Sequence, residues 1–228
     1  MLPDVHFITA MRMHLGLPLS AVLPSSCACG APLSGSGYHL LHCCRYRGSS
    51  VSLRHHRIVR VLASYARQAG AVVEVEKVVD EDGRRIDLEV HFAESSSMVD
   101  VTVRDPTAAG VVRRAAAEAG AAARDAEADK EKVYGGVARA TGQRLFTFTM
   151  DVTGALSESA QQLVDLVVRH YQDGEEEPDP MFRQRLSMDL ACALQRGNGD
   201  VVASGLACAR AAESGRLGGV GRKRRWAA

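Results

Sequence analysis

Apolar and polar residues alternate with a period of two along two neighbouring stretches of the chain. In residues 85–92 and 99–104 the apolar positions are Ile86, Leu88, Val90, Phe92, Val99, Val101 and Val103. Because successive side chains of a strand point to opposite faces, this pattern predicts two strands that each have a polar face. The residues on these polar faces are Asp87, Glu89, Asp100 and Thr102.

Further strands and a long helix are predicted around this pair. Residues 72–79 have the composition of a strand, and Asp82-Gly83 predicts a hairpin turn between it and the strand at 85–92. Pro106 ends the third strand before an alanine-rich helix over residues 107–141, and residues 144–150 return as a fourth strand. A helix that crosses from the third strand to the fourth favours a parallel pair. The predicted fold class is therefore α/β with a mixed sheet, in the order helix, strand, strand, strand, helix, strand.

Helical periodicity precedes the sheet. The segment Met11–Leu19 is typical of the end of an apolar helix, stopped by Gly16 and Pro18. Ser52 predicts the start of a second helix that runs to Gly70. The apolar side of that helix carries Ile58, Val61, Leu62 and Tyr65, and the other side mostly carries Arg54, Arg57, Arg60 and Arg67. The basic side could follow a phosphate backbone, although a solvated arginine-rich face is the commoner reason for such a pattern.

Two more helical segments are predicted after the sheet. Ser157 caps a helix whose buried side carries Leu163, Leu166, Val167 and Tyr171. Residues 173–180 form an acidic linker rich in helix-breaking residues, and residues 182–212 are helical again. The pair Gly197-Asn198 interrupts this last segment, which is consistent with a helical hairpin.

Length and composition indicate one folded domain with appendages. The chain has 228 residues, 46% hydrophobic and 24% charged, which is enough to bury a core. We divide it into a basic N-terminal segment (1–50), a core (51–172), an acidic linker with a helical segment (173–212) and a basic, disordered tail (213–228). No apolar run reaches the length of a membrane span, and the N-terminus lacks the layout of a signal peptide. An intracellular protein is therefore predicted, and the basic run 221–226 is a candidate nuclear import signal or phosphate-binding arm.

Four of the six cysteines crowd together near the N-terminus, at positions 27, 29, 43 and 44. This spacing suits a metal site in a reducing compartment better than a disulfide framework. The candidate zinc ligands are Cys27, Cys29, His39 and Cys43. His39 and Cys43 would share one helical face because they are four residues apart. His42 or Cys44 could substitute for one of the ligands, and reduced structural cysteines are the alternative interpretation.

Charge is polarised along the chain although the net charge is only +1. Residues 1–70 hold seven Lys or Arg against one acid, whereas residues 71–100 hold nine acids against three bases. A basic platform beside an acidic cleft would draw in phosphates while retaining cations. Carboxylates such as Asp87 and Asp100 on neighbouring strands can hold a hard divalent cation, Mg²⁺ or Mn²⁺, that assists phosphodiester hydrolysis. The alternative is an ordinary antiparallel sheet with one wetted face.

The order of several short motifs resembles a known family. These motifs are Arg12–Pro18, Cys27-Ala-Cys29-Gly30, His39–Cys43, Arg54-His55-His56, Arg85-Ile86-Asp87, Asp100–Val103 with Pro106, Lys130–Tyr134, Leu186-Ser187 and Leu194–Asn198. Together they cover residues 11–205 and resemble the C-terminal restriction-like endonuclease region of non-LTR retrotransposon reverse transcriptase-like proteins. The resemblance implies a restriction-endonuclease-like mixed sheet with an N-terminal zinc knuckle and C-terminal helices. It also implies that the chain corresponds to the region that follows the polymerase in such elements.

The resemblance assigns roles to individual residues. It implies that Cys27, Cys29, His39 and Cys43 bind zinc, and that Asp87 and Asp100 bind the metal that serves cleavage of target DNA. Restriction-type nucleases carry a lysine two residues beyond the second acid, but Thr102 stands there. The catalytic lysine is then expected on the following helix, as Lys130 or Lys132, with a slight preference for Lys132 because it lies nearer Tyr134. His55 and His56 resemble a family motif, and Arg54 beside them is expected to meet a phosphate.

Two departures from the family pattern leave the carboxylates in place. Ile86 stands where the family usually has proline, and Glu76-Lys77 stands where it often has Glu-Pro. The predicted function is a metal-dependent endonuclease that nicks DNA, with the RNA of the element as a further candidate partner. Two alternatives remain open: an inactive nucleic-acid-binding remnant, and a zinc-stabilised structural or interaction domain.

Overall fold

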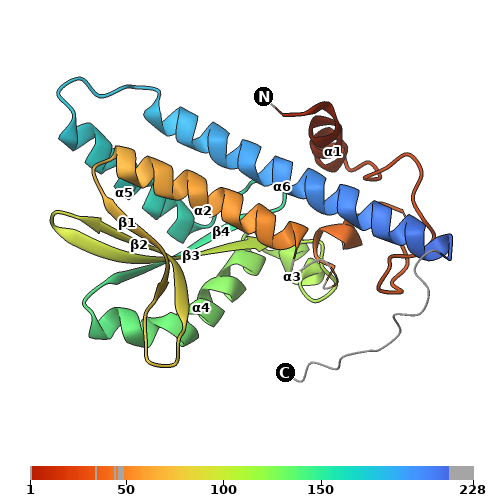
Figure 1. Cartoon of the computed structure of the whole chain (residues 1–228), viewed down its shortest axis with the longest axis horizontal. Coiled ribbons are helices and arrows are strands. Elements are labelled where there is room, and N and C mark those ends of the chain that lie inside the picture. Colours follow the sequence, from red (N-terminus) through yellow and green to blue (C-terminus); the bar gives the residue numbers. More distant parts are fainter. Residues whose placement is uncertain (1, 34, 44, 46–48, 216–228) are drawn as a thin grey trace.

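The sheet is four-stranded and mixed, and its strands follow the sequence in the order β1-β2-β3-β4 (Figure 1). The computed structural model describes residues 2–33, 35–43, 45 and 49–215. The strands are β1 (Val72–Val78), β2 (Arg85–Phe92), β3 (Ser95–Arg104) and β4 (Arg144–Asp151). The pairs β1/β2 and β2/β3 are antiparallel, and β3/β4 is parallel. The predicted α/β class, strand order and parallel crossover are confirmed.

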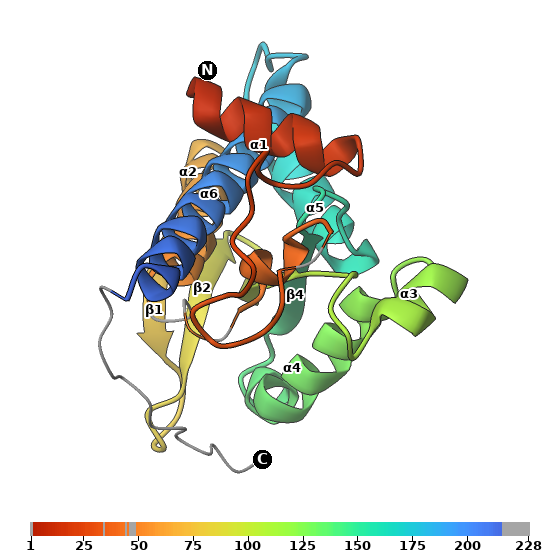
Figure 2. The same cartoon turned by 90° about the vertical axis from the view of Figure 1, so that its right-hand side faces the viewer.

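Helices cover both faces of the sheet. They are α1 (Asp4–His14), the 3₁₀ helix η1 (Tyr38–Leu41), α2 (Ser50–Gln68), α3 (Val112–Ala117), α4 (Ala121–Ala140), α5 (Glu158–Gly174) and α6 (Phe182–Glu213). Apolar side chains of α2, α5 and α6 form one core with the sheet, while α4 packs on the sheet in a separate cluster. Figure 2 shows α2, α5 and α6 together on one side and α4 on the other.

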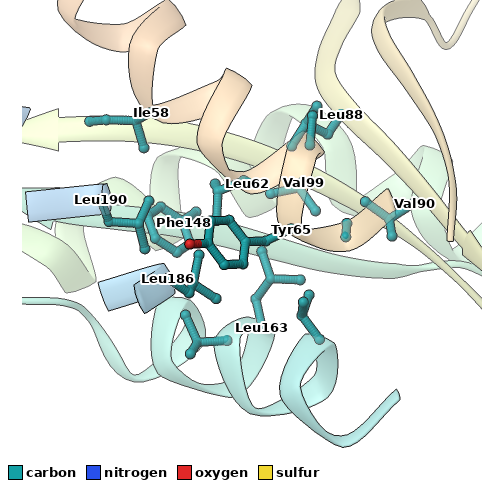
Figure 3. Packing of buried hydrophobic residues seen from close by; sticks show 14 of the residues in the cluster. Ile58, Leu62, Tyr65, Leu88, Val90, Val99, Phe148, Leu163, Leu186 and Leu190 are labelled. Carbon is teal, nitrogen blue, oxygen red and sulfur yellow. The ribbon is translucent and has the colours of Figure 1, made fainter. Parts of the chain in front are cut away.

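The larger core joins three helices to the middle of the sheet. Leu62 and Tyr65 of α2 meet Leu186 and Leu190 of α6 beside Phe148 of β4 (Figure 3). These side chains are all at most 7% exposed. The helical periodicity of residues 50–68 produces this arrangement because residues three or four apart lie on one side of a helix. The predicted apolar sides of α2 and α5 are the sides that the structure buries or partly buries.

The predicted helix over residues 107–141 is divided in two. Gly120 has φ +77°, a left-handed conformation that ends regular helix and that glycine adopts without strain. The short α3 precedes this break and α4 follows it. The expectation of one long helix was therefore wrong, because alanine content alone does not show where a glycine turns the chain.

The predicted helical hairpin at Gly197-Asn198 is also wrong. Helix α6 continues through both residues for 32 residues, and Asn198 is fully buried. Gly197 lies against α2, where an added Cβ would be 2.8 Å from the Arg54 Cα. The glycine therefore permits a close approach of two helices instead of breaking one of them.

Arg54 does not lie on a solvated side of α2. It is 3% exposed, and its guanidinium donates a hydrogen bond to the Asn198 side chain at 2.9 Å. Burial lowers the pKa of Arg54 to about 10, against the opposing charge of Asp105. The Arg54 guanidinium faces α6, although the residue also lines a pocket with His55 and His56, and its expected contact with a phosphate stays a prediction.

The last segment of the chain lies outside the described residues. These residues, 216–228, include the basic run proposed as an import signal or phosphate-binding arm. Among the residues that the structure does describe, no helix has the length and apolar character needed to cross a bilayer.

Candidate active site and zinc site

Asp87 and Asp100 lie at the point where β2 and β3 separate. The last pair of this antiparallel ladder is Leu88 with Val99, and extending the register by one residue places Asp87 opposite Asp100. The Val101 N–H donates to the Asp87 Oδ2 at 2.6 Å, so the Asp87 carboxylate takes the place of a strand partner. The sequence-predicted acids are thus brought together at the open end of the ladder.

The strand β2 also changes its packing at Asp87. Leu88 and Val90 belong to the core under α2, whereas Ile86 packs with Tyr134 of α4 on the other side of the sheet. The strict alternation expected over residues 86–92 therefore breaks at the aspartate. This change coincides with the end of the β2–β3 ladder, where the Asp87 carboxylate lies against His55 of α2.

On the α2 side, Asp87 meets His55 and Glu76. The His55 Nε2 lies 3.1 Å from the Asp87 Oδ1. Burial on its own lowers the pKa of His55, but the hydrogen bond and the charge of Asp87 outweigh it, and the pKa is raised. Glu76 has φ +54° and interrupts the pairing of β1 with β2 opposite Asp87. One ligand atom from each of the three residues lies within 4.8 Å of the others.

On the α4 side, Asp100 meets Lys130. Asp100 is only 3% exposed, and the Lys130 Nζ donates to its Oδ1 at 2.9 Å. Burial raises the pKa of Asp100 and the charge of Asp87 adds to this, while Lys130 and a hydrogen bond from Thr102 oppose it. The pKa of Asp100 remains raised, so Lys130 and Thr102 do not fully offset burial and the charge of Asp87. A further positive charge would be favourable here.

Of the two candidate lysines, the structure brings only Lys130 to the carboxylates. Its ammonium also lies 5.8 Å from the centre of the Tyr134 ring, whose hydroxyl donates to the Arg85 carbonyl at 2.7 Å. Lys132 is 77% exposed at its side chain and lies 3.8 Å from Asp129. The preference for Lys132 rested on sequence distance from Tyr134, whereas one helical turn separates Lys130 from Tyr134 and aligns them on one side of α4.

A pocket of about 520 Å³ opens beside the carboxylates. Its lining includes His55, His56, Glu76 and Thr102. The His56 Nδ1 lies 2.7 Å from the Ser52 carbonyl, and its Nε2 lies 3.6 Å from Glu76. The histidine pair predicted to bind nucleic acid thus lines this pocket, and His55 is turned toward Asp87.

Glu76 is the residue at this site to which the sequence analysis gave no role. Only part of the signal was present in the sequence: Asp82-Gly83 locates the hairpin, but a two-residue turn there would pair Glu76 with Glu89, and it is the observed longer loop that places Glu76 opposite Asp87. Two acids facing one another in an antiparallel pair are unfavourable without a cation between them. The positive φ of Glu76, in contrast, has no sequence signal that we can identify.

The predicted zinc ligands converge. One atom from each of Cys27, Cys29, His39 and Cys43 lies within 4.8 Å of the others. The Cys27 and Cys43 sulfurs are 3.7 Å apart, and the Cys29 sulfur is 3.1 Å from the His39 Nε2. Two sulfurs bound to one tetrahedral zinc at about 2.3 Å would be about 3.8 Å apart. The donor set and its spacing fit zinc, and these four residues could bind it.

The local structure of this cluster differs from the expected helix. The helix η1 ends at Leu41, so His39 and Cys43 do not share a helical face, and Cys43 returns to the cluster after η1. Burial raises the pKa of the Cys43 thiol and lowers that of His39. A bound Zn²⁺ offsets the cost of a buried thiolate, and a neutral imidazole is the form that coordinates metal.

The alternative ligands are separated from the cluster or outside the described residues. The His42 Nδ1 lies 2.6 Å from the Asp105 Oδ2, at the end of β3, and so ties the cysteine segment to the sheet. Hydrogen bonds from His42 and Thr107 lower the pKa of Asp105, although burial acts to raise it. Cys44 lies outside the described residues.

Comparison with known proteins identifies no family for this chain. No protein-family model matches it, and no curated protein matches it. The function is therefore argued from the arrangement of the residues themselves.

Proposed function

We propose that this protein is a metal-dependent DNA endonuclease that nicks its target by phosphodiester hydrolysis. The observation that carries the proposal is the Lys130–Asp100 ion pair beside Asp87, at the open end of the β2–β3 ladder. Two carboxylates and one ammonium at a single opening are the charges that hydrolysis of a phosphodiester requires. Buried carboxylates with a raised pKa, as Asp100 has, occur preferentially at functional sites.

In the proposed mechanism the three side chains have separate tasks. Asp87 and Asp100 hold the divalent cation, Mg²⁺ or Mn²⁺, and the buried position of Asp100 fixes its carboxylate. When bound, such a cation supplies positive charge to the phosphate and makes a neighbouring water more acidic. Lys130 stabilises the negative charge that develops on the scissile phosphate. Its side chain is 29% exposed, so the ammonium can reach a substrate while its stem packs against the protein.

The proposed fold family is that of the restriction-like nucleases, and the proposed origin is a non-LTR retrotransposon. The order helix, strand, strand, strand, helix, strand supports this fold family. The antiparallel pairs β1/β2 and β2/β3 and the parallel pair β3/β4 support it as well. Thr102 occupies the place where such enzymes carry the lysine. Lys130 supports the proposal in spite of this, because its long side chain brings the amine to the second acid from the adjoining helix.

We propose that duplex DNA is the partner and that the N-terminal part docks it. Residues 1–70 carry the excess of basic residues, and Arg45 and Arg60 are exposed. A zinc-bound cysteine segment would hold this basic part in a fixed orientation next to the pocket lined by His55 and His56. The RNA of the element is a second candidate ligand, and action on DNA would place the protein in the nucleus.

A second candidate function is binding of nucleic acid without cleavage. The cysteine cluster is compatible with it, because zinc could stabilise a binding surface whether or not the carboxylates act. The Lys130–Asp100 pair would then be a structural ion pair. The two functions share a fold and differ in whether DNA is cut.

Plasmid nicking tests the proposal. Purified protein with Mg²⁺ or Mn²⁺ is expected to convert supercoiled DNA to the nicked form, and Asp100→Ala and Lys130→Ala are each expected to lower the rate about 100-fold or more. Lys132→Ala is the matched control, because it removes an exposed lysine from the same helix. If no nicking occurs but gel shifts show binding that weakens steeply with salt, the binding function replaces the endonuclease. Absence of both leaves a zinc-stabilised structural domain.

A further inference from the structure

His55, Glu76 and Asp87 come from three separate elements and meet at one point. His55 belongs to α2, Glu76 to β1 and Asp87 to β2. Their ligand atoms all lie within 4.8 Å of one another. Among the described residues no such group of three or more contains both Asp87 and Asp100. The most compact set of ligand atoms around Asp87 is thus on the α2 side.

The spacing within this set suits an octahedral cation. Neighbouring ligands on an octahedral ion with bonds of 2.0–2.1 Å lie about 3 Å apart, and opposite ligands about 4.2 Å apart. The His55 Nε2 and the Asp87 Oδ1 are 3.1 Å apart, which matches the shorter separation. The pocket of about 520 Å³ next to His55 and Glu76 leaves room for water or a phosphate oxygen at the remaining positions.

In a second group of similar composition, a lysine already neutralises the negative charge of the carboxylates. Glu74, Glu89 and His91 also converge, but the Lys77 ammonium binds both carboxylates of that group and lies 2.9 Å from Glu74. Around Glu76 and Asp87 the structure shows, within its described part, ion pairs with histidines and none with a lysine or arginine. A divalent cation would supply the charge that Lys77 supplies to the other group.

The imidazole decides which cation is preferred. Mg²⁺ strongly favours oxygen ligands and gives up its waters reluctantly, whereas first-row transition-metal ions accept imidazole nitrogen beside carboxylates. A set of one nitrogen and two carboxylates therefore discriminates against Mg²⁺. Among transition-metal ions, Mn²⁺ is also well suited to carboxylate and water ligands.

We infer that His55, Glu76 and Asp87 form a binding site for a transition-metal ion, with Mn²⁺ bound in preference to Mg²⁺. This inference rests on the proposed function in one respect, since the ion held by Asp87 would be the one that serves cleavage. Glu76 and His55 are then further ligands of the ion that Asp87 holds, and Asp100 with Lys130 lies beside it on the α4 side. Metal binding itself is independent of whether DNA is cut.

Calorimetric titration in the absence of DNA tests the site. The protein is first loaded with one equivalent of zinc, so that the thiolate cluster is filled, and is then titrated with Mn²⁺ or Mg²⁺. Mn²⁺ is expected to bind at least about tenfold more tightly than Mg²⁺. His55→Ala is expected to weaken Mn²⁺ binding about tenfold or more and to change Mg²⁺ binding by less than about threefold, while Glu76→Gln weakens both.

Matched variants and a second signal keep the test decisive. His14→Ala and Glu81→Gln remove exposed residues of the same types at the end of α1 and in the β1–β2 turn, and they are expected to leave both affinities unchanged. Loss of the free Mn²⁺ signal in electron paramagnetic resonance reports the same binding. Should His55→Ala not fold, His55→Gln retains the size of the side chain and replaces nitrogen by an oxygen ligand.

Two results overturn the inference: equal affinity for the two ions, or Mn²⁺ binding that His55→Ala and His55→Gln leave intact. Failure of the proposed function gives a different pattern. In that case Mn²⁺ binds through His55 as expected, but no divalent ion supports nicking. Conversely, nicking that requires Asp100 and Lys130, yet keeps in the His55 variants the same dependence on Mn²⁺ and Mg²⁺ as in the wild type, retains the endonuclease and rejects this metal site.

Discussion

Gly197 of α6 lies against the backbone of Arg54 of α2. A Cβ at Gly197 would be 2.8 Å from the Arg54 Cα and 2.6 Å from its Cβ. The same contact allows the buried Arg54 guanidinium to reach Asn198, whose side-chain amide in turn donates to the Val152 carbonyl at 2.8 Å. The absence of a side chain at one position thus brings two long helices close enough for a buried polar network.

Replacing Gly197 with alanine should destabilise the protein. The added methyl group has to displace the backbone of α2, and overpacking of this kind costs about 1–3 kcal/mol. Gly136→Ala is the matched control, because Gly136 lies in α4 with nothing within 4 Å of an added Cβ, and that change should stabilise by about 0.4–1 kcal/mol. Urea unfolding measures both, and equal effects would contradict the close approach.

Removal of zinc should loosen the N-terminal segment. Cys27 and Cys43 are in one apolar cluster with Leu40 of η1 and Val202 and Leu206 of α6. A chelator, or Cys43→Ser, is therefore expected to lower the melting temperature and to increase hydrogen exchange in residues 19–43, because thiolates without a cation are costly to bury. Mass spectrometry under native conditions should find one zinc per chain.

Cys192 provides the control for the zinc prediction. It is a free cysteine of α6 that does not belong to the ligand cluster. Cys192→Ser should leave the zinc content at one per chain. Retention of zinc by Cys43→Ser, or its loss from Cys192→Ser, would show that the zinc is not bound by this cluster, and a wild type without zinc would mean that the cluster consists of reduced structural cysteines.

Lys130 and Lys132 should differ in their effect on stability as well as on activity. Lys130→Ala leaves the Asp100 carboxylate buried without its ammonium partner, and is expected to cost about 1–3 kcal/mol of unfolding free energy. Lys132→Ala removes an exposed side chain and should change it by less than about 0.5 kcal/mol. Chemical denaturation at neutral pH distinguishes the two, and equal costs would mean that the Lys130–Asp100 pair is not formed.

The sheet was predictable because its signals are local. Alternation over residues 85–92 and 99–104 locates two strands, and Asp82-Gly83 locates the turn before the first of them. The short turn between Phe92 and Ser95 brings β3 back beside β2, and this register places Asp87 opposite Asp100. The convergence of Cys27, Cys29, His39 and Cys43 was also predictable, since cysteine and histidine at such short spacing indicate a metal site. In both cases the residues that meet are close together along the chain or joined by a hairpin.

The remaining features depend on contacts between distant segments. Arg54 is buried because Gly197, more than a hundred residues later, admits α2 against α6, and neither residue alone signals this. Lys130 and Lys132 are the same residue type in one short segment, so the sequence does not show which of them is near the carboxylates. The orientation of α4 on the sheet brings Lys130 to Asp100 and leaves Lys132 exposed. The face of a helix that meets a sheet is set by tertiary packing, which outweighs local patterns.

Asp200 of α6 holds α1 and α2 together and should make the protein sensitive to acid. The Asp200 Oδ1 lies 2.8 Å from the His6 Nε2 of α1, and its Oδ2 accepts a hydrogen bond from Arg57 of α2. Burial acts to raise the pKa of Asp200, but these two hydrogen bonds and the charges of their donors outweigh it, so the pKa lies below the ordinary 3.8. A lowered pKa in the folded state means that the unfolded chain binds the proton more tightly. The stabilisation is therefore present above about pH 4 and is lost as the pH falls through the lowered pKa.

Asp200→Asn should remove this stabilisation and leave α1 less firmly attached. Because the Asp200 side chain is 30% exposed, water screens the interaction, and we expect a cost of only about 0.5–1.5 kcal/mol at pH 7. The difference in unfolding free energy between wild type and variant should shrink as the pH is lowered below 4. Hydrogen exchange should show faster opening of residues 4–14 in the variant. The exposed Asp173 serves as control, and a difference that stays constant with pH, or one that Asp173→Asn reproduces, would contradict the role of Asp200.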